Sequence, residues 1–278
     1  MDALHKVLLH DEHMLLGAEL ALGSDGRHAP HSYAGVDERA AFHEGVALID
    51  LSGLGSRLIT GPTAPALASS VFAGRELAIG EVAPEVALTG DGSIASLALV
   101  ARTGTEELAC WDLAGRGDIL SSWLAFVAGI EQRGVRPFDG CEVEDASEAL
   151  VPLLLWGPQA SNVLSDYLGE QTVPGKGTVA NRTLDRIGCL VATPDFGETP
   201  CHLVLVPPLY ARVLWRSFLS FQSVSPVGMR ALVREVASRY PFLAPVEGED
   251  RLIATRQELA EHGLLRSEPT FIGARGLA

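Results

Sequence analysis

The sequence predicts an α+β fold built from two similar halves. Segments rich in apolar and β-branched residues alternate with segments of helical periodicity along the 278 residues. One short unit occurs twice, at Arg57–Leu67 and at Leu153–Val163, and each copy places a strand before Gly-Pro and an amphipathic helix after it. With 47% hydrophobic residues the chain can bury a large core, so we expect two tightly packed α+β halves with a ligand pocket between them.

The first elements follow from apolar spacing and from proline. Apolar residues recur at helical intervals over Leu4–Ala21, which predicts a helix ending near Gly23, and Ser24–Tyr33 is typical of a loop. A proline in a first turn favours a helix that starts after Gly61. The next predicted elements are a helix at Asp37–Glu44, strands at Val46–Leu51 and Arg57–Thr60, and a helix from Gly61 to Phe72.

The middle of the chain is predicted to be rich in strands and the last third in helices. Turn residues separate the middle strands, and longer amphipathic runs mark the helices. The predicted strands are Val86–Leu88, Ile94–Ala101, Glu107–Trp111 and Leu150–Trp156, and the predicted helices are Gly117–Val127, Gly157–Leu168, Leu209–Phe221, Val227–Arg239 and Arg251–His262. Gln171–Asp185 is expected to be a polar connection.

A rigid turn carries the first candidate site residue, Glu198. Two strand-like runs, Gly188–Ala192 and Cys201–Val206, flank a turn that begins with Pro194 and ends with Pro200. A carboxylate on such a turn is well placed for a ligand that offers two parallel N–H donors. The alternative is a solvated acid at a hairpin tip.

Composition excludes several classes of partner. A formal net charge of −14 disfavours nucleic acid, and the sequence has no apolar run of the ~20 residues that a membrane span requires. The N-terminus has no signal-peptide pattern, and the four cysteines have no paired spacing, so we expect reduced thiols in a cytoplasmic protein. His10 and His13 lack the i, i+4 spacing of a zinc motif, and no metal is expected.

Six short signatures, in order, resemble the aminomethyltransferase family, which includes the T-protein of glycine cleavage. They are Leu9–Leu20 (LHDEHMLLGAEL), Pro30–Tyr33 (PHSY), Ala47–Gly53 (ALIDLSG), Leu88–Arg102 (LTGDGSIASLALVAR), Leu155–Ala160 (LWGPQA) and Phe271–Arg275 (FIGAR). The resemblance implies two interleaved halves, residues 1–50 with 141–240 and residues 51–140 with 241–278. It also implies that the family's third, C-terminal β-domain is absent.

The same resemblance implies a tetrahydrofolate site. Phe196–Glu198 falls on the family's Y-T-G-E, whose glutamate binds the pterin ring, and a pterin shows two adjacent N–H donors. Arg230 matches the arginine of G-A-R-D, and Tyr33 matches the tyrosine of P-x-x-Y. The expected cofactor is therefore tetrahydrofolate or its methyl or methylene form, held by Glu198, Arg230 and Tyr33.

The sequence departs from the family at its catalytic aspartate. Ser96 and Leu97 occupy the place of V-I-D-D, and neither side chain can accept a proton at neutral pH, so glycine cleavage is not expected. Asp112, Asp91 and His28 are the candidates for a replacement acid or base. Their alternatives are ordinary: a helix cap for Asp112, a β-turn for Asp91 and an exposed loop histidine for His28.

These observations favour an enzyme, a tetrahydrofolate-dependent one-carbon transferase or demethylase acting on a small molecule. Two other functions stay open: a non-enzymatic folate-binding assembly or regulatory factor, and a folate-independent enzyme that uses the same cavity. Fold resemblance cannot choose among them. Because the third domain is expected to be absent, we also expect a second copy or a partner chain to cover apolar surface at the channel.

Overall fold

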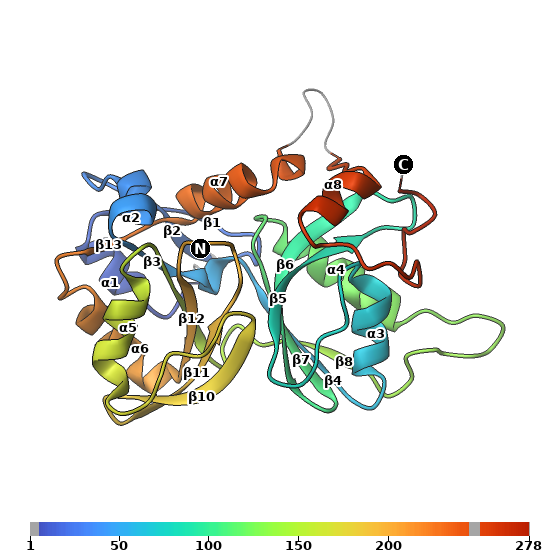
Figure 1. Ribbon diagram of the computed structural model, residues 1–278, viewed down its shortest axis with the longest axis horizontal. Coiled ribbons are helices and arrows are strands. Elements are labelled where there is room, and N and C mark those ends of the chain that lie inside the picture. The colour runs from blue at the N-terminus through green and yellow to red at the C-terminus, as the bar shows by residue number, and fades with distance from the viewer. Residues whose placement is uncertain (1–5, 245–250, 278) are drawn as a thin grey trace, which may run out of the picture. The chain divides into compact units, whose positions relative to one another are not determined.

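The computed structural model describes residues 6–244 and 251–277 (Figure 1). Contacts divide the chain into two compact units, and each unit combines two separate segments. Unit 1 contains residues 1–55 and 146–233, and unit 2 contains residues 56–145 and 234–278. The division falls inside helix α7 (Met229–Arg239).

Unit 1 is built on a six-stranded sheet with the order β10-β11-β12-β9-β3-β13. All neighbouring strands run antiparallel except β3 and β13, which are parallel. The strands are β3 (Val46–Asp50), β9 (Val151–Trp156), β10 (Thr178–Leu184), β11 (Ile187–Thr193), β12 (Cys201–Val206) and β13 (Val224–Pro226). A separate hairpin pairs β1 (Ala18–Leu22) with β2 (His28–Tyr33).

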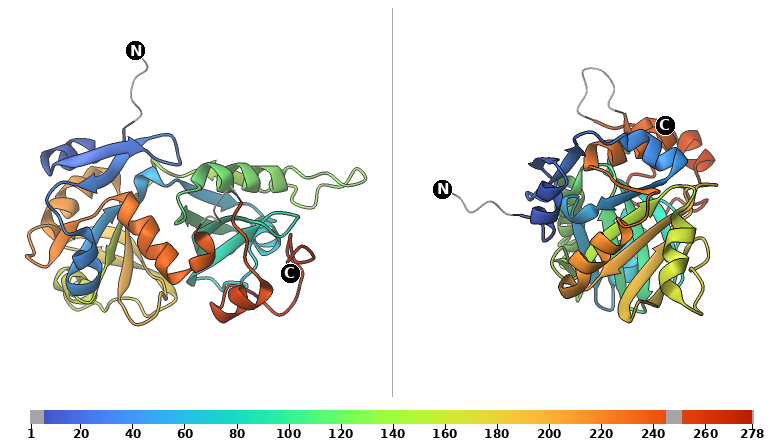
Figure 2. Two further views of the ribbon diagram at one scale, coloured as in Figure 1. Left: turned by 90° about the horizontal axis from the view of Figure 1, so that it is seen from above. Right: turned by 90° about the vertical axis from the view of Figure 1, so that its left-hand side faces the viewer.

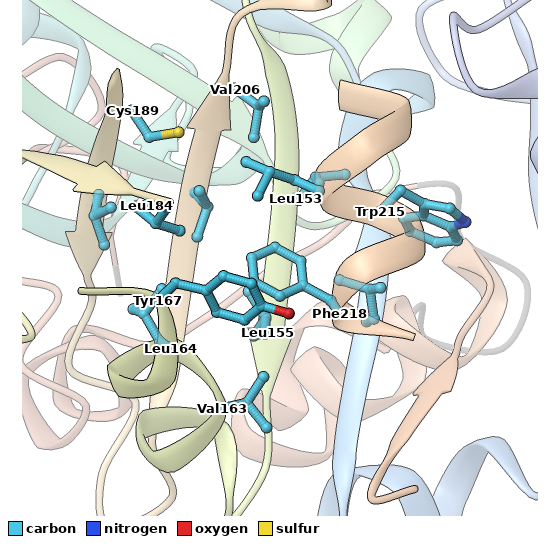
Figure 3. Close-up of a cluster of buried hydrophobic side chains, with 14 of the residues drawn as sticks. Leu153, Leu155, Val163, Leu164, Tyr167, Leu184, Cys189, Val206, Trp215 and Phe218 are labelled. Atoms are coloured by element: carbon cyan, nitrogen blue, oxygen red, sulfur yellow. The ribbon is translucent and has the colours of Figure 1, made fainter. Parts of the chain in front are cut away.

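Two helices cover the unit 1 sheet and form its core. Helices α5 and α6 place Tyr167 and Phe218 in an edge-to-face contact with ring centroids 5.1 Å apart, and Figure 3 shows both rings over β9 and β12. Trp215 on α6 is completely buried. The helices of the unit are α1 (His10–Leu15), α2 (Glu38–Glu44), the 3-10 turn η1 (Leu51–Gly53), α5 (Ala160–Leu168) and α6 (Pro208–Phe218).

Unit 2 is built on a five-stranded antiparallel sheet with the order β5-β6-β7-β4-β8. Helices α3 and α4 contribute Leu67 and Leu124 to one buried cluster against this sheet. Figure 2 shows the connection between α4 and β8 as a long arm. The elements are β4 (Ser56–Thr60), α3 (Ala64–Val71), β5 (Val82–Leu88), β6 (Ile94–Gly104), β7 (Glu107–Asp112), α4 (Gly117–Ala128), β8 (Glu142–Asp145), η2 (Pro241–Leu243) and α8 (Arg256–Glu261).

The repeated Gly-Pro unit has the same structural role in both units. Gly61 follows β4 and Gly157 follows β9, and their φ angles are 107° and 152°. A Cβ on Gly61 would lie 1.9 Å from the carbonyl oxygen of Gly140, and one on Gly157 would lie 2.3 Å from that of Gly45. Glycine is therefore required at both positions by backbone that passes too close for a side chain.

Four expected elements differ from the structure. The helix predicted over Leu4–Ala21 ends at Leu15, because the chain turns at Gly17 (φ 77°) into strand β1; residues 1–5 lie outside the described part. The predicted loop before Tyr33 contains strand β2, and the predicted polar connection contains β10. The last helix starts only at Arg256, where a capping box of Thr255 and Glu258 satisfies its first N–H groups.

A buried histidine makes the stability of unit 1 sensitive to acid. His202 on β12 is 2% exposed, with Nε2 2.8 Å from Ser161 Oγ and Nδ1 3.0 Å from Thr193 Oγ1. Burial lowers the pKa of His202 to about 4, below its usual 6.5. The unfolded chain therefore binds the proton more tightly, and stability present above pH 6.5 is lost as the pH falls towards 4.

At pH 5 this loss is about 2 kcal/mol, and we expect His202→Gln to remove it. The measurement is urea unfolding of both proteins at several pH values between 4 and 7. His43→Gln, at an exposed position on α2, is the control and should keep the wild-type pH profile. Parallel profiles for wild type and His202→Gln would contradict the assignment.

Candidate functional site

The turn that carries Glu198 is fixed by its neighbours. Phe196 is 6% exposed and stacks on Trp156 with ring centroids 4.8 Å apart. Gly197 adopts a φ of 96°, its N–H donates to Asp195 Oδ1 at 3.0 Å, and its carbonyl accepts from Lys176 Nζ at 2.5 Å. Glu198 is exposed and forms no hydrogen bond or ion pair with the described residues. The turn therefore presents an ionisable carboxylate whose oxygens are available to an external donor.

Arg230 and Tyr33 lie on segments that Glu38 holds together. One carboxylate oxygen of Glu38 accepts the N–H of Tyr33 at 3.1 Å and the N–H of Gly228 at 2.8 Å. A Cβ on Gly228 would lie 2.2 Å from the carbonyl oxygen of His31, so glycine is required for this close approach. Arg230 follows in the first turn of α7, with an exposed side chain.

The side chain of Tyr33 belongs to a buried polar chain that sequence reasoning missed. Tyr33 is 4% exposed and its hydroxyl lies 2.8 Å from His13 Nδ1, while His13 Nε2 lies 3.0 Å from Asp50 Oδ2. Burial raises the pKa of the Tyr33 phenol, which keeps its O–H. The carboxylate of Asp50 can only accept, so the neutral tautomer of His13 with its proton on Nε2 donates to Asp50 and accepts the Tyr33 hydroxyl at Nδ1. The only sequence signal was an acid and a histidine next to apolar runs.

Asp112 lies beside the residue that replaces the family's aspartate. The hydroxyl of Ser96 on β6 donates to Asp112 at the end of β7, and both residues are completely buried. The carboxylate also accepts the N–H of Ala114 at 3.3 Å and that of Arg116 at 2.7 Å. Burial raises the pKa of Asp112 to about 6. Its contacts also close the turn before α4.

The other two candidate acids or bases are positioned differently. Asp91 is exposed in the turn between β5 and β6, where Thr89 Oγ1 donates to it at 2.6 Å and Arg251 at 2.7 Å. The hydrogen bond from Thr89, followed by those from Ser93, lowers the pKa of Asp91 to about 2, which makes it a weak base. His28 is half-buried on β2, and its carbonyl accepts the N–H of Val7 at 3.4 Å.

The candidates divide between the units. Glu198, Arg230, Tyr33 and His28 belong to unit 1, and Asp91 and Asp112 belong to unit 2. Among the described residues no group of three or more His, Cys, Asp or Glu side chains could hold a metal ion. Over the same residues, no helix combines the length and apolar character needed to cross a bilayer.

Comparisons with known proteins identify one family. The family model described as the GCVT N-terminal domain matches residues 9–234. The glycine cleavage system aminomethyltransferase T from Bartonella henselae has a similar structure, with a TM-score of 0.73, 20% identity and coverage of 99% of this chain and 74% of that one. The heterotetrameric sarcosine oxidase from Corynebacterium sp. U-96 aligns with a TM-score of 0.42, 20% identity and coverage of 70% and 91%. No curated protein sequence matches the chain.

Proposed function

The chain belongs to the GCVT N-terminal domain family, and from this premise we propose a tetrahydrofolate-dependent one-carbon transferase that does not carry out glycine cleavage. The observation that carries the proposal is Glu198, an exposed carboxylate that has no hydrogen bond or ion pair with the described residues, on a turn fixed by the Phe196–Trp156 stack. Such a carboxylate fits the two adjacent N–H donors of a pterin, because it can accept both at once. Bound folate would supply the one-carbon unit, and the chain would supply orientation and proton transfer.

The proposed roles of the remaining residues follow from their positions. Arg230 is an exposed cation on the segment that Glu38 ties to β2, and it suits the carboxylates of the folate tail. Asp112 supplies the acid or base beside Ser96, since its pKa of about 6 suits proton transfer near neutral pH. Because Ser96 replaces the aspartate of the family, we expect no ammonia release from an aminomethylated carrier protein.

The decisive experiment is a calorimetric titration with tetrahydrofolate and its 5-methyl and 5,10-methylene forms. Glu198→Gln replaces one acceptor oxygen with a donor and leaves a pterin N–H unpaired, at a cost of about 1–3 kcal/mol. We therefore expect roughly ten- to a hundredfold weaker binding without a change in melting temperature. The control is Glu170→Gln, at another exposed position of unit 1. Equal folate affinity in Glu198→Gln, or no binding by the wild type, would overturn the assignment.

A folate-binding protein without transfer activity is the second candidate. It is favoured by the complete burial of Asp112 and by its hydrogen bonds to the turn before α4. The two candidates differ in formaldehyde exchange between solution and bound 5,10-methylenetetrahydrofolate. A transferase should accelerate this exchange and lose the acceleration in Asp112→Asn, whereas a binding protein should show neither effect.

A further inference from the structure

Unit 1 contains a cavity of about 270 Å³ that the proposed folate contacts do not use. For comparison, a cavity of about 150 Å³ lined by apolar side chains holds benzene. The cavity therefore has room for a small organic molecule. Its lining has a polar part, Lys6, Arg27, Ser52, Ser147 and Glu148, and an apolar part, Leu8, Val151 and Pro208.

Arg27 gives the cavity a cation that is held in place. Its side chain is 16% exposed, with Nε 3.3 Å from Asp25 Oδ2 and a guanidinium nitrogen 3.4 Å from the carbonyl oxygen of Ser147. These contacts tie the turn between β1 and β2 to the segment before β9. Lys6, which is exposed and whose backbone forms a parallel β-bridge with His28, adds a second positive charge to the lining.

Ser52 gives the cavity a hydroxyl that can donate to a ligand. The residue is 5% exposed, and its hydroxyl makes no hydrogen bond within the described part of the chain. Its backbone N–H donates to Asp50 Oδ1 at 2.9 Å, and Asp50 is held in turn by His13. The buried polar chain thus fixes the backbone of Ser52, and the Ser52 hydroxyl makes no described hydrogen bond that a ligand would have to replace.

We propose that this cavity binds a small organic monocarboxylate. The carboxylate pairs with Arg27 and Lys6 and accepts the hydroxyl of Ser52, while the apolar part of the ligand packs on Leu8 and Val151. Glu148, the one acidic side chain among the described residues of the lining, is exposed and repels a second negative charge, so a monoanion is preferred to a dicarboxylate or a phosphate dianion. The proposal does not rest on folate binding.

The test uses hexanoate and 3-phenylpropionate as probes, with their amides and adipate as comparisons. Titration of methyl-labelled protein followed by NMR should shift the signals of Leu8 and Val151. We expect both acids to bind at least tenfold more tightly than their amides, and hexanoate more tightly than adipate. Equal binding of acids and amides, shifts confined to other residues, or no binding would overturn the proposal.

Variants separate this site from the proposed folate site. Arg27→Gln should weaken hexanoate binding at least tenfold. Ser52→Ala should weaken it several-fold, and it changes the protein less than Arg27→Gln does because it removes only a hydroxyl. Arg39→Gln removes an exposed arginine of the same unit and should leave binding unchanged. Glu198→Gln should also leave hexanoate binding unchanged, so failure of the folate proposal is distinguishable from failure of this one. Unchanged affinity in both Arg27→Gln and Ser52→Ala would contradict the assignment.

Discussion

Replacing His13 by alanine should lower the free energy of unfolding by about 3–5 kcal/mol, which is a large part of the stability of a typical domain. His13 is completely buried and links Asp50 at 3.0 Å to Tyr33 at 2.8 Å, with its ring edge-to-face on Trp215 at 4.9 Å. Without the imidazole, the carboxylate of Asp50 stays buried. Of the hydrogen bonds given above, it then keeps the one from the N–H of Ser52. A buried charge that loses its partner is among the most destabilising changes in a protein.

The free energy of unfolding is measured by urea unfolding at pH 7. The slope of the transition is compared between variants, because an unchanged slope shows that the variants differ in stability alone. Tyr33→Phe removes only the hydroxyl and should cost about 1–3 kcal/mol, because His13 then lacks a donor. Met14→Ala changes a neighbouring side chain of α1 that is 52% exposed and should change stability by less than about 0.5 kcal/mol. A loss below about 1.5 kcal/mol in His13→Ala would show that the buried chain is not a main source of stability.

Replacing Glu85 by glutamine should stabilise unit 2 at alkaline pH. Glu85 on β5 is 3% exposed, and one carboxylate oxygen accepts the N–H of Gly74 at 2.9 Å. Burial raises the pKa of Glu85 to about 8, while Gly74 and Arg266 act in the opposite direction. The folded state thus binds the proton more tightly than the unfolded chain, so stability is greatest below pH 4.5 and falls as the pH rises towards 8.

At pH 7.5 the raised pKa of Glu85 lowers the free energy of unfolding by about 4 kcal/mol, compared with its value at low pH. The adjoining cavity of about 40 Å³ has room for water, which lowers the cost of the charge, so we expect a gain of about 3 kcal/mol in Glu85→Gln. The gain should shrink to nearly zero at pH 4.5. Urea unfolding of the wild type and of Glu85→Gln between pH 4.5 and 8.5 measures this gain. The control is Glu106→Gln, at an exposed position of the same unit. A difference that does not change with pH would contradict the burial argument.

The fold class could be predicted from the sequence because its signals are local. The Gly-Pro unit after β4 and after β9 reflects a backbone contact that excludes any side chain at Gly61 and Gly157. The boundaries of α1 and β2 could not be predicted. The chain turns at Gly17, which has a positive φ, and the sequence does not distinguish this glycine from the others. Apolar spacing alone does not distinguish a short helix followed by a strand from one long helix.

The candidate site was only partly predictable. The turn of Glu198 is visible in the sequence because prolines and glycine mark it. By contrast, the approach of Ser96 to Asp112 depends on the pairing of β6 with β7, and the link from His13 to Asp50 joins positions 37 residues apart. Single-sequence patterns carry no information on such distant contacts. The pKa of Asp112 likewise depends on burial, which only the packed structure reveals.

The interleaved order of the two units has a consequence for folding during synthesis. The first segment of unit 1 ends at residue 55, and its second segment starts at residue 146. At ribosomal rates of about 5–20 residues per second, the first segment waits on the order of 5–20 seconds for β9, which lies next to β3 in the sheet. During this interval β3 has neither of its neighbours in the sheet, β9 and β13, and the nascent chain is most exposed to aggregation and to chaperones.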